Sequence, residues 1–273
     1  MEDLVDMKKW LKITGITALS LLLMVTLSAC GKSSSSDSVQ LKTKGTLTVG
    51  LEGTYSPYSY RENGKLKGFE VELAQDVAKK MGYKVKFVPT KWDSLIAGLG
   101  SKKFDVVFNN VTITNARAKK FSFTDPYIYS REVLITQKDN TTINNIDDIK
   151  GKKIVAGVGT NNETVAQKFG AKVVSSSEFT SALNLVKEGR ADGNLNAREA
   201  YLSYLKDNPS AANEFKYTVI PTNKVKSAKI AGLVNKQNPA LTKKINKALK
   251  ELKADGTLKK LSVKYFTADI TEK

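Results

Sequence analysis

The chain of 273 residues contains no histidine and only one cysteine, Cys30. Histidine-based catalytic triads and histidine-rich zinc sites are excluded, because their chemistry needs an imidazole. A single cysteine forms no disulfide within the chain, and the sequence after Cys30 offers no thiol nucleophile. Carboxylates, hydroxyls, amides and cations therefore remain for binding or catalysis, and we predict neither a metal site nor a cofactor.

Long apolar runs are also scarce, and the run 13–27 lies close to the amino terminus. Three lysines precede it, and Leu27-Ser-Ala-Cys30 ends it. A basic segment, a short apolar segment and a small-residue cleavage site are typical of a signal peptide. The run is shorter than the roughly 20 residues of a membrane span. We predict that residues 1–29 are a signal peptide, with Met1 or Met7 as its start.

The tetrapeptide before the body of the chain resembles the bacterial lipobox, in which the cysteine becomes the lipidated first residue of the mature protein. We therefore predict that Cys30 carries lipid, including palmitate. Residues 30–44 are polar and rich in serine, as expected of a flexible tether. The predicted location is the extracellular face of the bacterial cytoplasmic membrane, with the protein held there by its lipid anchor.

The formal net charge is +17, from 44 basic and 27 acidic residues. Such a charge favours anionic surroundings such as lipid headgroups or wall polymers. Nucleic acid is the competing interpretation of this charge. The lysines are scattered along the sequence, however, and an exported lipoprotein seldom meets nucleic acid. We predict no nucleic-acid binding and a basic solvated surface.

The body of the chain alternates strand and helix patterns, which predicts an α/β fold with mostly parallel sheets. A first lobe is predicted over residues 45–135 and a second over 136–226, and residues 227–273 return to the first lobe. The expected strands are 46–51, 84–89, 104–108, 153–157, 171–174, 191–195 and 229–234. The expected helices are 69–81, 92–99, 160–170, 179–188, one that runs through Tyr204, and 239–256.

Polar residues follow several of these strands, where ligands bind in open α/β sheets. Residues 109–117 end in Arg117, whose planar fork of donors matches a carboxylate. A zwitterion would fit between Glu52, Arg117 and the helix amino terminus at Thr160. Each residue also has a purely structural interpretation. Arg117 would form a surface ion pair, Tyr55 and Trp92 would pack in the core, and the acids at 70 and 72 would complement a helix dipole.

An ordered set of motifs is similar to the family 3 extracellular solute-binding proteins of ABC transporters. The matching segments cover nearly the whole predicted mature body and are Gly68-Phe-Glu-Val-Glu-Leu-Ala74, Trp92-Asp-Ser-Leu-Ile-Ala-Gly-Leu99, Phe104-Asp-Val-Val107, Thr112-Ile-Thr114, Phe123-Thr-Asp-Pro-Tyr127, Gly151-Lys-Lys-Ile154 and Asp255-Gly-Thr-Leu258. The resemblance implies a two-lobed periplasmic-binding-protein type II fold that closes around a polar amino acid. Segments around residues 50–55, 90–93 and 110–114 most resemble cystine-binding members.

Carried over by position, the resemblance implies a set of ligand contacts. Arg117, Thr160 and Asn161 would hold the α-carboxylate, Tyr55 and Trp92 would flank the ligand side chain, and Glu52 would lie beside them. The remaining implied contacts are Asn110, Val111, Thr112, Gly157 and Asn196. One position departs from the pattern, because Ala197 stands where many relatives carry the aspartate that binds the ligand ammonium.

The expected function is a non-enzymatic receptor that binds an amino acid, with cystine first, and delivers it as a monomer to ABC permease subunits. Three alternatives remain open: the same role with another polar amino acid, an enzyme of the prephenate- or arogenate-dehydratase type on the same fold, and a surface adhesin. Carboxylate chemistry through Glu52 would be the route for an enzyme.

Overall fold

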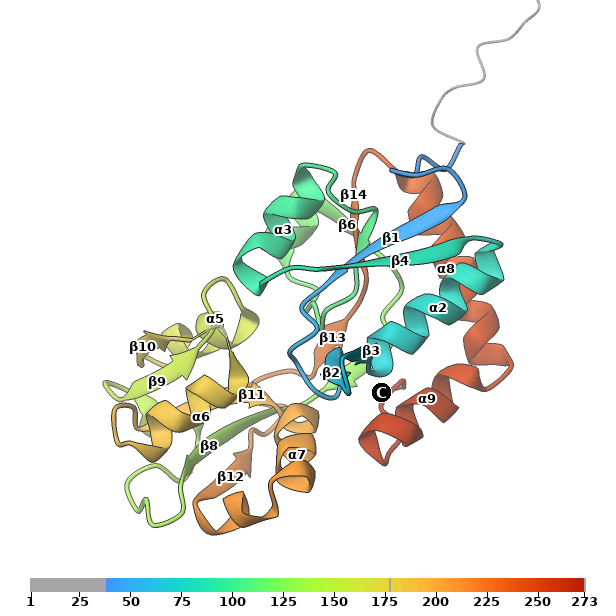
Figure 1. Ribbon diagram of the computed structural model, residues 1–273. Helices are drawn as coiled ribbons and strands as arrows, with labels where there is room; N and C mark the ends of the chain where they lie inside the picture. The colour runs from blue at the N-terminus through green and yellow to red at the C-terminus, as the bar shows by residue number, and fades with distance from the viewer. Residues whose placement is uncertain (1–37, 177, 273) are drawn as a thin grey trace, which may run out of the picture. The chain divides into compact units, whose positions relative to one another are not determined.

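A computed structural model of the protein describes residues 38–176 and 178–272, and Val39–Lys273 forms one compact unit (Figure 1). The predicted signal peptide and Cys30 lie outside the described residues. In the described part of the chain, no helix has both the length and the apolar character needed to cross a bilayer.

The first sheet has five strands, and four of them run in the same direction. Its order is β4 (Lys84–Pro89), β1 (Thr46–Leu51), β5 (Val106–Val107), β14 (Leu233–Asn235) and β6 (Phe121–Phe123). Only β14 runs against its neighbours β5 and β6. Because β14 lies between strands from the first half, the carboxy-terminal part of the chain returns to this sheet. Its helices are α2 (Phe69–Met81), α3 (Trp92–Gly100), α4 (Asn115–Lys120), α8 (Pro239–Ala254) and α9 (Thr257–Phe266).

The second sheet also has four strands in one direction and one against them. Its order is β10 (Lys172–Ser175), β9 (Lys153–Ala156), β11 (Gly193–Ala197), β8 (Glu132–Gln137) and β12 (Phe215–Val219). Strand β8 is antiparallel to both β11 and β12. The associated helices are η1 (Ile146–Ile149), α5 (Asn161–Lys168), α6 (Phe179–Lys187), α7 (Arg198–Asp207) and η2 (Pro209–Asn213).

Two short ribbons complete the described strands. A hairpin pairs β2 (Tyr60–Glu62) with β3 (Lys65–Lys67), and β7 (Ile128–Ser130) pairs with β13 (Ala228–Ile230). The sequence predicts one strand over 229–234, and this prediction is wrong. Residues 228–230 and 233–235 pair in different sheets, and a Cβ at Gly232 between them would lie 2.7 Å from the Phe108 ring. Glycine thus lets the chain pass close to that ring where it changes sheets.

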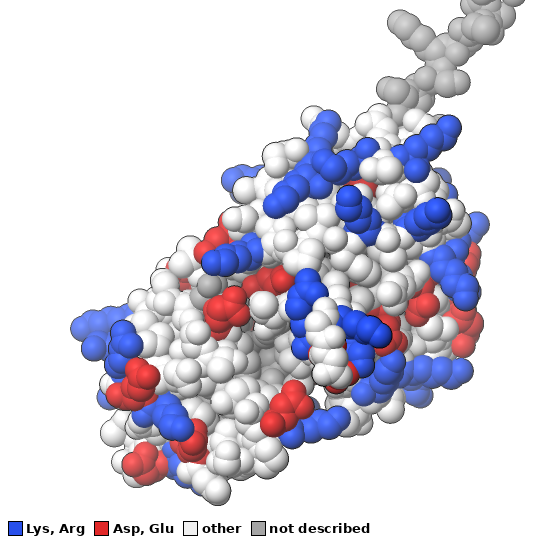
Figure 2. Space-filling view, viewed as in Figure 1, with Lys and Arg blue, Asp and Glu red and all other residues white. Residues whose placement is uncertain are grey.

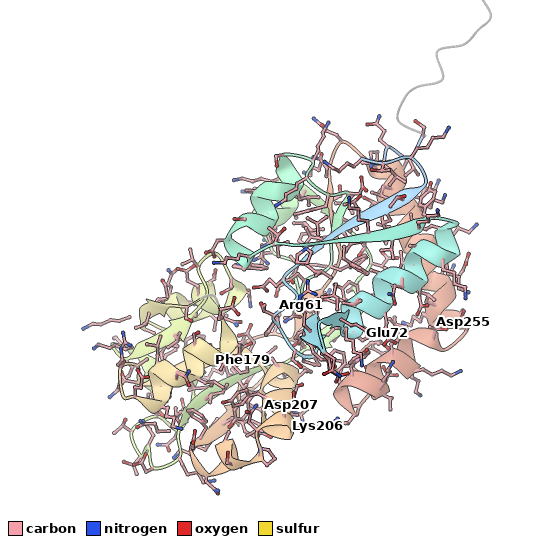
Figure 3. All side chains as sticks on the ribbon, viewed as in Figure 1. Arg61, Glu72, Phe179, Lys206, Asp207 and Asp255 are labelled. Carbon is pink, nitrogen blue, oxygen red and sulfur yellow. The ribbon has the colours of Figure 1, made fainter. Side chains whose placement is uncertain are left out.

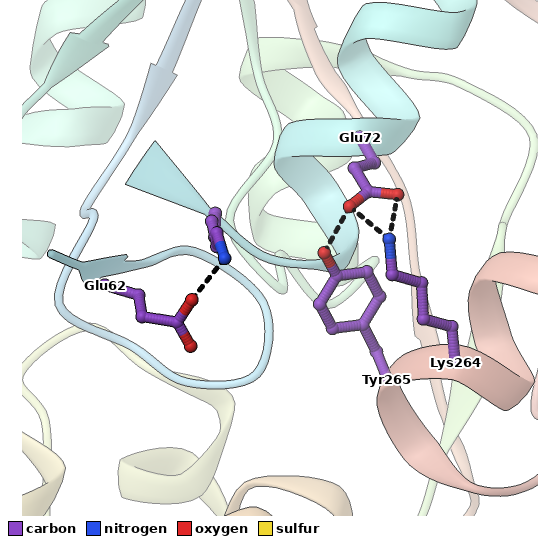
Figure 4. Close-up of polar contacts among 5 residues, drawn as sticks. Glu62, Glu72, Lys264 and Tyr265 are labelled. Carbon is purple, nitrogen blue, oxygen red and sulfur yellow. Dashed lines mark hydrogen bonds and ion pairs between the residues drawn. The ribbon is translucent and has the colours of Figure 1, made fainter. Parts of the chain in front are cut away.

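Glu72 ties α9 to α2. Its carboxylate accepts hydrogen bonds from Tyr265 Oη at 2.5 Å and from Lys264 Nζ at 2.6 Å (Figure 4). These contacts lower the pKa of Glu72 despite the opposing effect of its partial burial. Glu72 is therefore a structural anion. The basic side chains are scattered over the face seen in Figure 2, with acidic side chains between them, and are not gathered into one stripe.

Phe104 fills the space between β1 and α3, and two glycines allow its close approach. A Cβ at Gly50 would lie 2.7 Å from the Phe104 ring, and one at Gly98 would lie 2.8 Å from it. The ring is buried, with 2% of its surface exposed. This packing fixes α3 against the end of β1, so it positions both Trp92 and Glu52.

Substitution of Gly98 should therefore depend on the residue at position 104. We expect Gly98→Ala to lower the free energy of unfolding by about 1–3 kcal/mol because the new methyl group meets the ring. In a Phe104→Ala background the obstruction is gone and alanine favours the helix by about 1 kcal/mol, so the same change should stabilise the protein. Urea unfolding of the four proteins measures this reversal of sign.

Gly100→Ala in the same helix is the matched control, because its Cβ would lie 4.0 Å from the Phe121 ring and meet nothing closer. It should not destabilise either background. An equal effect of Gly98→Ala in both backgrounds would show that the ring is not the obstacle.

Candidate functional site

A cleft lies between the carboxyl ends of the two sheets. The cleft is lined by every predicted contact residue except Val111. Val111 is fully buried beside Trp92 in the apolar cluster under the cleft, and its carbonyl accepts a hydrogen bond from the Ala231 N–H at 3.1 Å. Whether the lining residues contact a ligand stays a prediction.

Glu52 and Asn109 hold each other at the ends of β1 and β5. Asn109 Nδ2 donates to Glu52 Oε2 at 2.7 Å, and the Glu52 N–H donates to Asn109 Oδ1 at 2.7 Å. Burial is the main cause that raises the pKa of Glu52 to about 7. One carboxylate oxygen is thus fixed by an amide, and the group carries a fractional charge near neutral pH.

Arg117 is held by backbone carbonyls from both walls of the cleft. Its Nη1 donates to the Thr112 carbonyl at 2.9 Å, and its Nη2 donates to the Gly159 carbonyl at 2.8 Å. The guanidinium lies over the Trp92 ring, 5.3 Å from its centroid. No carboxylate in residues 38–176 or 178–272 forms an ion pair with Arg117. Burial lowers its pKa, so an anion in the cleft would find a partly desolvated cation.

The loop that carries this wall depends on Glu70, which sequence reasoning interpreted only as a helix-dipole acid. Glu70 is fully buried, and its Oε1 accepts from the Asn110 N–H at 2.7 Å and from Tyr127 Oη at 2.5 Å. Asn110 has a positive φ of 48°. Burial raises the pKa of Glu70 to about 7. A signal was present in the sequence, because Glu70 shares the buried face of α2 with residues at helical spacing such as Leu73, Val77 and Met81.

On the second wall, Thr160 begins α5 and closes the turn after β9. Its hydroxyl donates to the Gly157 carbonyl at 2.6 Å and accepts from the Glu163 N–H at 3.1 Å. A Cβ at Gly157 would lie 2.9 Å from the Thr160 methyl group, so glycine is needed there. Asn161 follows, and its Nδ2 donates to Glu132 Oε1 at 2.6 Å. The start of α5 thus lines the cleft beside an amide side chain.

Further hydrogen bonds join the two walls directly. Trp92 Nε1 donates to the Val158 carbonyl at 2.8 Å, and Tyr55 Oη donates to Asn196 Oδ1 at 2.7 Å. Together with the bond between Arg117 and Gly159, they connect predicted contact residues of the first wall to residues of the second wall. The predicted packing role of the aromatic residues is therefore incomplete, because both also use their polar atoms across the cleft.

Sequence reasoning missed several residues that line the cleft, among them Glu132 and Phe179 (Figure 3). Phe179 is the first residue of α6. Within the described part of the chain, no group of three or more histidine, cysteine, aspartate or glutamate residues could hold a metal ion. The polar lining instead consists of amides, hydroxyls, carboxylates and one guanidinium, which suits a small ligand with charges of both signs.

Known proteins show the same pattern along the chain. Residues 47–268 match the model of the bacterial extracellular solute-binding proteins, family 3. The L-cystine-binding protein TcyA of Bacillus subtilis (strain 168) is 39% identical over 258 residues, which cover 90% of this chain and 94% of that protein. The L-cystine-binding protein TcyJ of Escherichia coli (strain K12) is 41% identical over 238 residues, which cover 85% and 87%.

A solved structure supports the fold. That of an ancestral arginine-binding protein bound to arginine is 38% identical, with a TM-score of 0.73, and the match covers 82% of this chain and 99% of that one. The predicted two-lobed periplasmic-binding-protein type II fold is confirmed by this likeness and by the family match. The chain belongs to the bacterial extracellular solute-binding proteins, family 3.

Proposed function

We propose that this protein is the lipid-anchored receptor of an ABC importer, which binds a polar amino acid between two lobes and delivers it to permease subunits. The observation that carries the proposal is the two-walled cleft in which one guanidinium faces amides, carboxylates and a helix amino terminus. Cystine is the proposed ligand, and the names of the relatives from B. subtilis and E. coli support it.

The ligand α-carboxylate is assigned to Arg117, with help from Thr112 and from the start of α5 at Thr160 and Asn161. Arg117 uses two nitrogen atoms for backbone carbonyls, and its remaining N–H groups are available to a carboxylate. The start of α5 adds a positive dipole end. These contacts would neutralise one ligand charge from both walls at once.

The rest of the ligand is assigned to the space between Tyr55 and Trp92, with Glu52 beside it. Backbone groups of Asn110, Val111 and Gly157 and the side chain of Asn196 complete the proposed contacts. Glu52 keeps one oxygen on Asn109, and its other oxygen is proposed to accept from a ligand nitrogen. An aromatic pair and an acid suit a side chain with an apolar middle and a polar end, as in cystine.

Lobe closure is proposed between residues 45–135 with 227–273 and residues 136–226, through crossing segments near Thr136 and Lys226. The direct bonds between the walls support this proposal, since they join the residues assigned to the ligand. Strand β8 of the second sheet begins at Glu132, which supports a first crossing just before that residue.

A ligand other than cystine is the second candidate, favoured by the likeness to a structure bound to arginine. Like cystine, free arginine as a ligand has a cationic group at each end, its α-ammonium group and its guanidinium group. The names of the relatives favour binding over catalysis, so we propose no enzymatic activity.

Ligand binding can be tested with a thermal-shift panel of the twenty amino acids plus cystine on the purified mature protein. At 100 times its dissociation constant, a ligand should stabilise the protein by about 2.7 kcal/mol. Cystine should give the largest shift. A largest shift with arginine would replace the ligand and keep the function, whereas no shift with any amino acid would refute the function. Incubation with arogenate should yield no product.

Removal of the Arg117 guanidinium should weaken cystine binding by about 2–5 kcal/mol, because a buried carboxylate would lose its charged partner. Arg117→Lys should fall between wild type and Arg117→Ala, since lysine keeps the charge and loses the planar fork. Titration calorimetry measures both. Arg61→Ala is the control, because Arg61 lies in the β2–β3 hairpin and bonds only the Gly64 carbonyl. Unchanged affinity in Arg117→Ala would contradict the assignment.

The anchor can be tested in cells by Cys30→Ala. Without the thiol no lipid can be attached, so the protein should move from the membrane fraction to the medium or remain as an unprocessed precursor. A second variant, Ser36→Ala in the predicted tether, should stay with the membrane. Unchanged membrane association and unchanged mass of the Cys30→Ala protein would rule out the lipid anchor.

A further inference from the structure

Glu132 is a buried carboxylate that the assigned contacts leave unused. It is the first residue of β8, only 5% of its surface is exposed, and it lines the cleft. Its Oε1 accepts from Asn161 Nδ2 at 2.6 Å. Its Oε2 is buried and has no hydrogen-bond partner within residues 38–176 and 178–272. A buried carboxylate oxygen without a donor is costly, so a donor from a ligand would satisfy it.

The position of Glu132 follows from strand pairing. Glu132 lies directly opposite Ala197 in the antiparallel pair of β8 and β11. Residues opposite each other in such a pair project from the same face of the sheet. Ala197 also lines the cleft, and its methyl group leaves the longer side chain of Glu132 room to reach it. At this position of the wall the carboxylate therefore comes from β8 and not from the end of β11.

The charges around the cleft point to the kind of donor required. Among the described residues that line it, three are acidic (Glu52, Glu132 and Glu178) and only Arg117 is basic. Glu52 and Glu132 belong to opposite walls, and each has one oxygen bound by an asparagine amide. Neither forms an ion pair with a described lysine or arginine. A cationic group on a ligand would supply the positive charge that these two acids lack.

We propose that Glu132 receives the ammonium group of the bound amino acid through its Oε2, while Asn161 holds its Oε1 in place. This inference rests on the proposed function, because it names the partner of a charge on the ligand assigned to the cleft. Glu132 then selects for a cationic nitrogen next to the carboxylate held by Arg117. Glu52, on the other wall, is left for a second polar group farther along the ligand.

The test compares cystine binding by wild type and Glu132→Gln with titration calorimetry. The amide keeps the shape and can still accept from Asn161, but it would turn N–H donors toward an ammonium donor. We expect affinity to fall at least about thirtyfold, as for loss of one partner in a buried charge pair. Glu199→Gln is the matched control, since Glu199 is also buried and accepts from Ser130 Oγ at 2.7 Å, but does not line the cleft.

The number of protons released on binding distinguishes direct contact between Glu132 and the ligand ammonium from an indirect effect through Asn161. Burial raises the pKa of Glu132 to about 7, with a smaller contribution from the nearby acid Glu199 and with Asn161 acting in the opposite direction. Near pH 7 part of the Glu132 groups therefore carry a proton, and an ammonium ion would drive off that proton. Calorimetry at pH 7 in buffers of different ionisation enthalpy should show fewer protons released by Glu132→Gln than by wild type. Cystine affinity of wild type should rise from pH 6 to pH 8.

The outcomes are distinct. Wild-type affinity in Glu132→Gln, with binding lost in Arg117→Ala, would overturn this inference and leave the proposed function intact. Weaker binding with unchanged proton release would also overturn it, because Glu132 would then act only through the position of Asn161. Failure of the wild-type protein to bind cystine or any amino acid would remove the proposed function and this inference together.

Discussion

The first wall of the cleft depends on a buried carboxylate, that of Glu70, which accepts a hydrogen bond from the N–H of a turn residue, Asn110. Asn110 has a positive φ, a left-handed conformation that asparagine adopts more readily than most other residues. Glu70 fixes it from α2, and Tyr127 donates to the same carboxylate oxygen. This turn sets the path of the chain to Thr112, whose carbonyl accepts a hydrogen bond from Arg117. An acid with no role at the cleft surface thus determines where the guanidinium lies.

Burial of acids without basic partners has an energetic consequence. The pKa values of Glu52, Glu70 and Glu132 are all raised by burial to about 7. The folded protein therefore binds more protons than the unfolded chain between about pH 4.5 and pH 7, and the contribution of these groups to stability falls as pH rises through that window. Of the three, only Glu52 and Glu132 line the cleft, where a cationic group would offset the cost of their burial.

Local patterns predicted the elements well and the contacts between them poorly. Helix α2 spans 69–81 as its apolar spacing predicts, and it ends at Gly82 in the left-handed conformation. Strand-end positions located the cleft lining, because parallel strands place their carboxyl ends at one edge. Glu132 was not predicted as a cleft residue because its strand was not predicted. Only its antiparallel register with Ala197 brings it to the cleft. Likewise, no local pattern encodes the bond from Arg117 to Gly159, which joins two sheets.

The charge of the cleft is opposite to that of the chain as a whole. The chain has a net charge of +17, whereas the described residues that line the cleft include three acids and one arginine. Long-range attraction follows the net charge and is screened over about 8–10 Å in physiological salt, whereas groups inside the cleft are screened far less. The basic exterior therefore influences which surfaces the protein approaches, and the acids influence what enters the cleft. Since Glu52 and Glu132 stand on opposite walls, a ligand with one cationic group would pair with only one of them, and a ligand with two would pair with both.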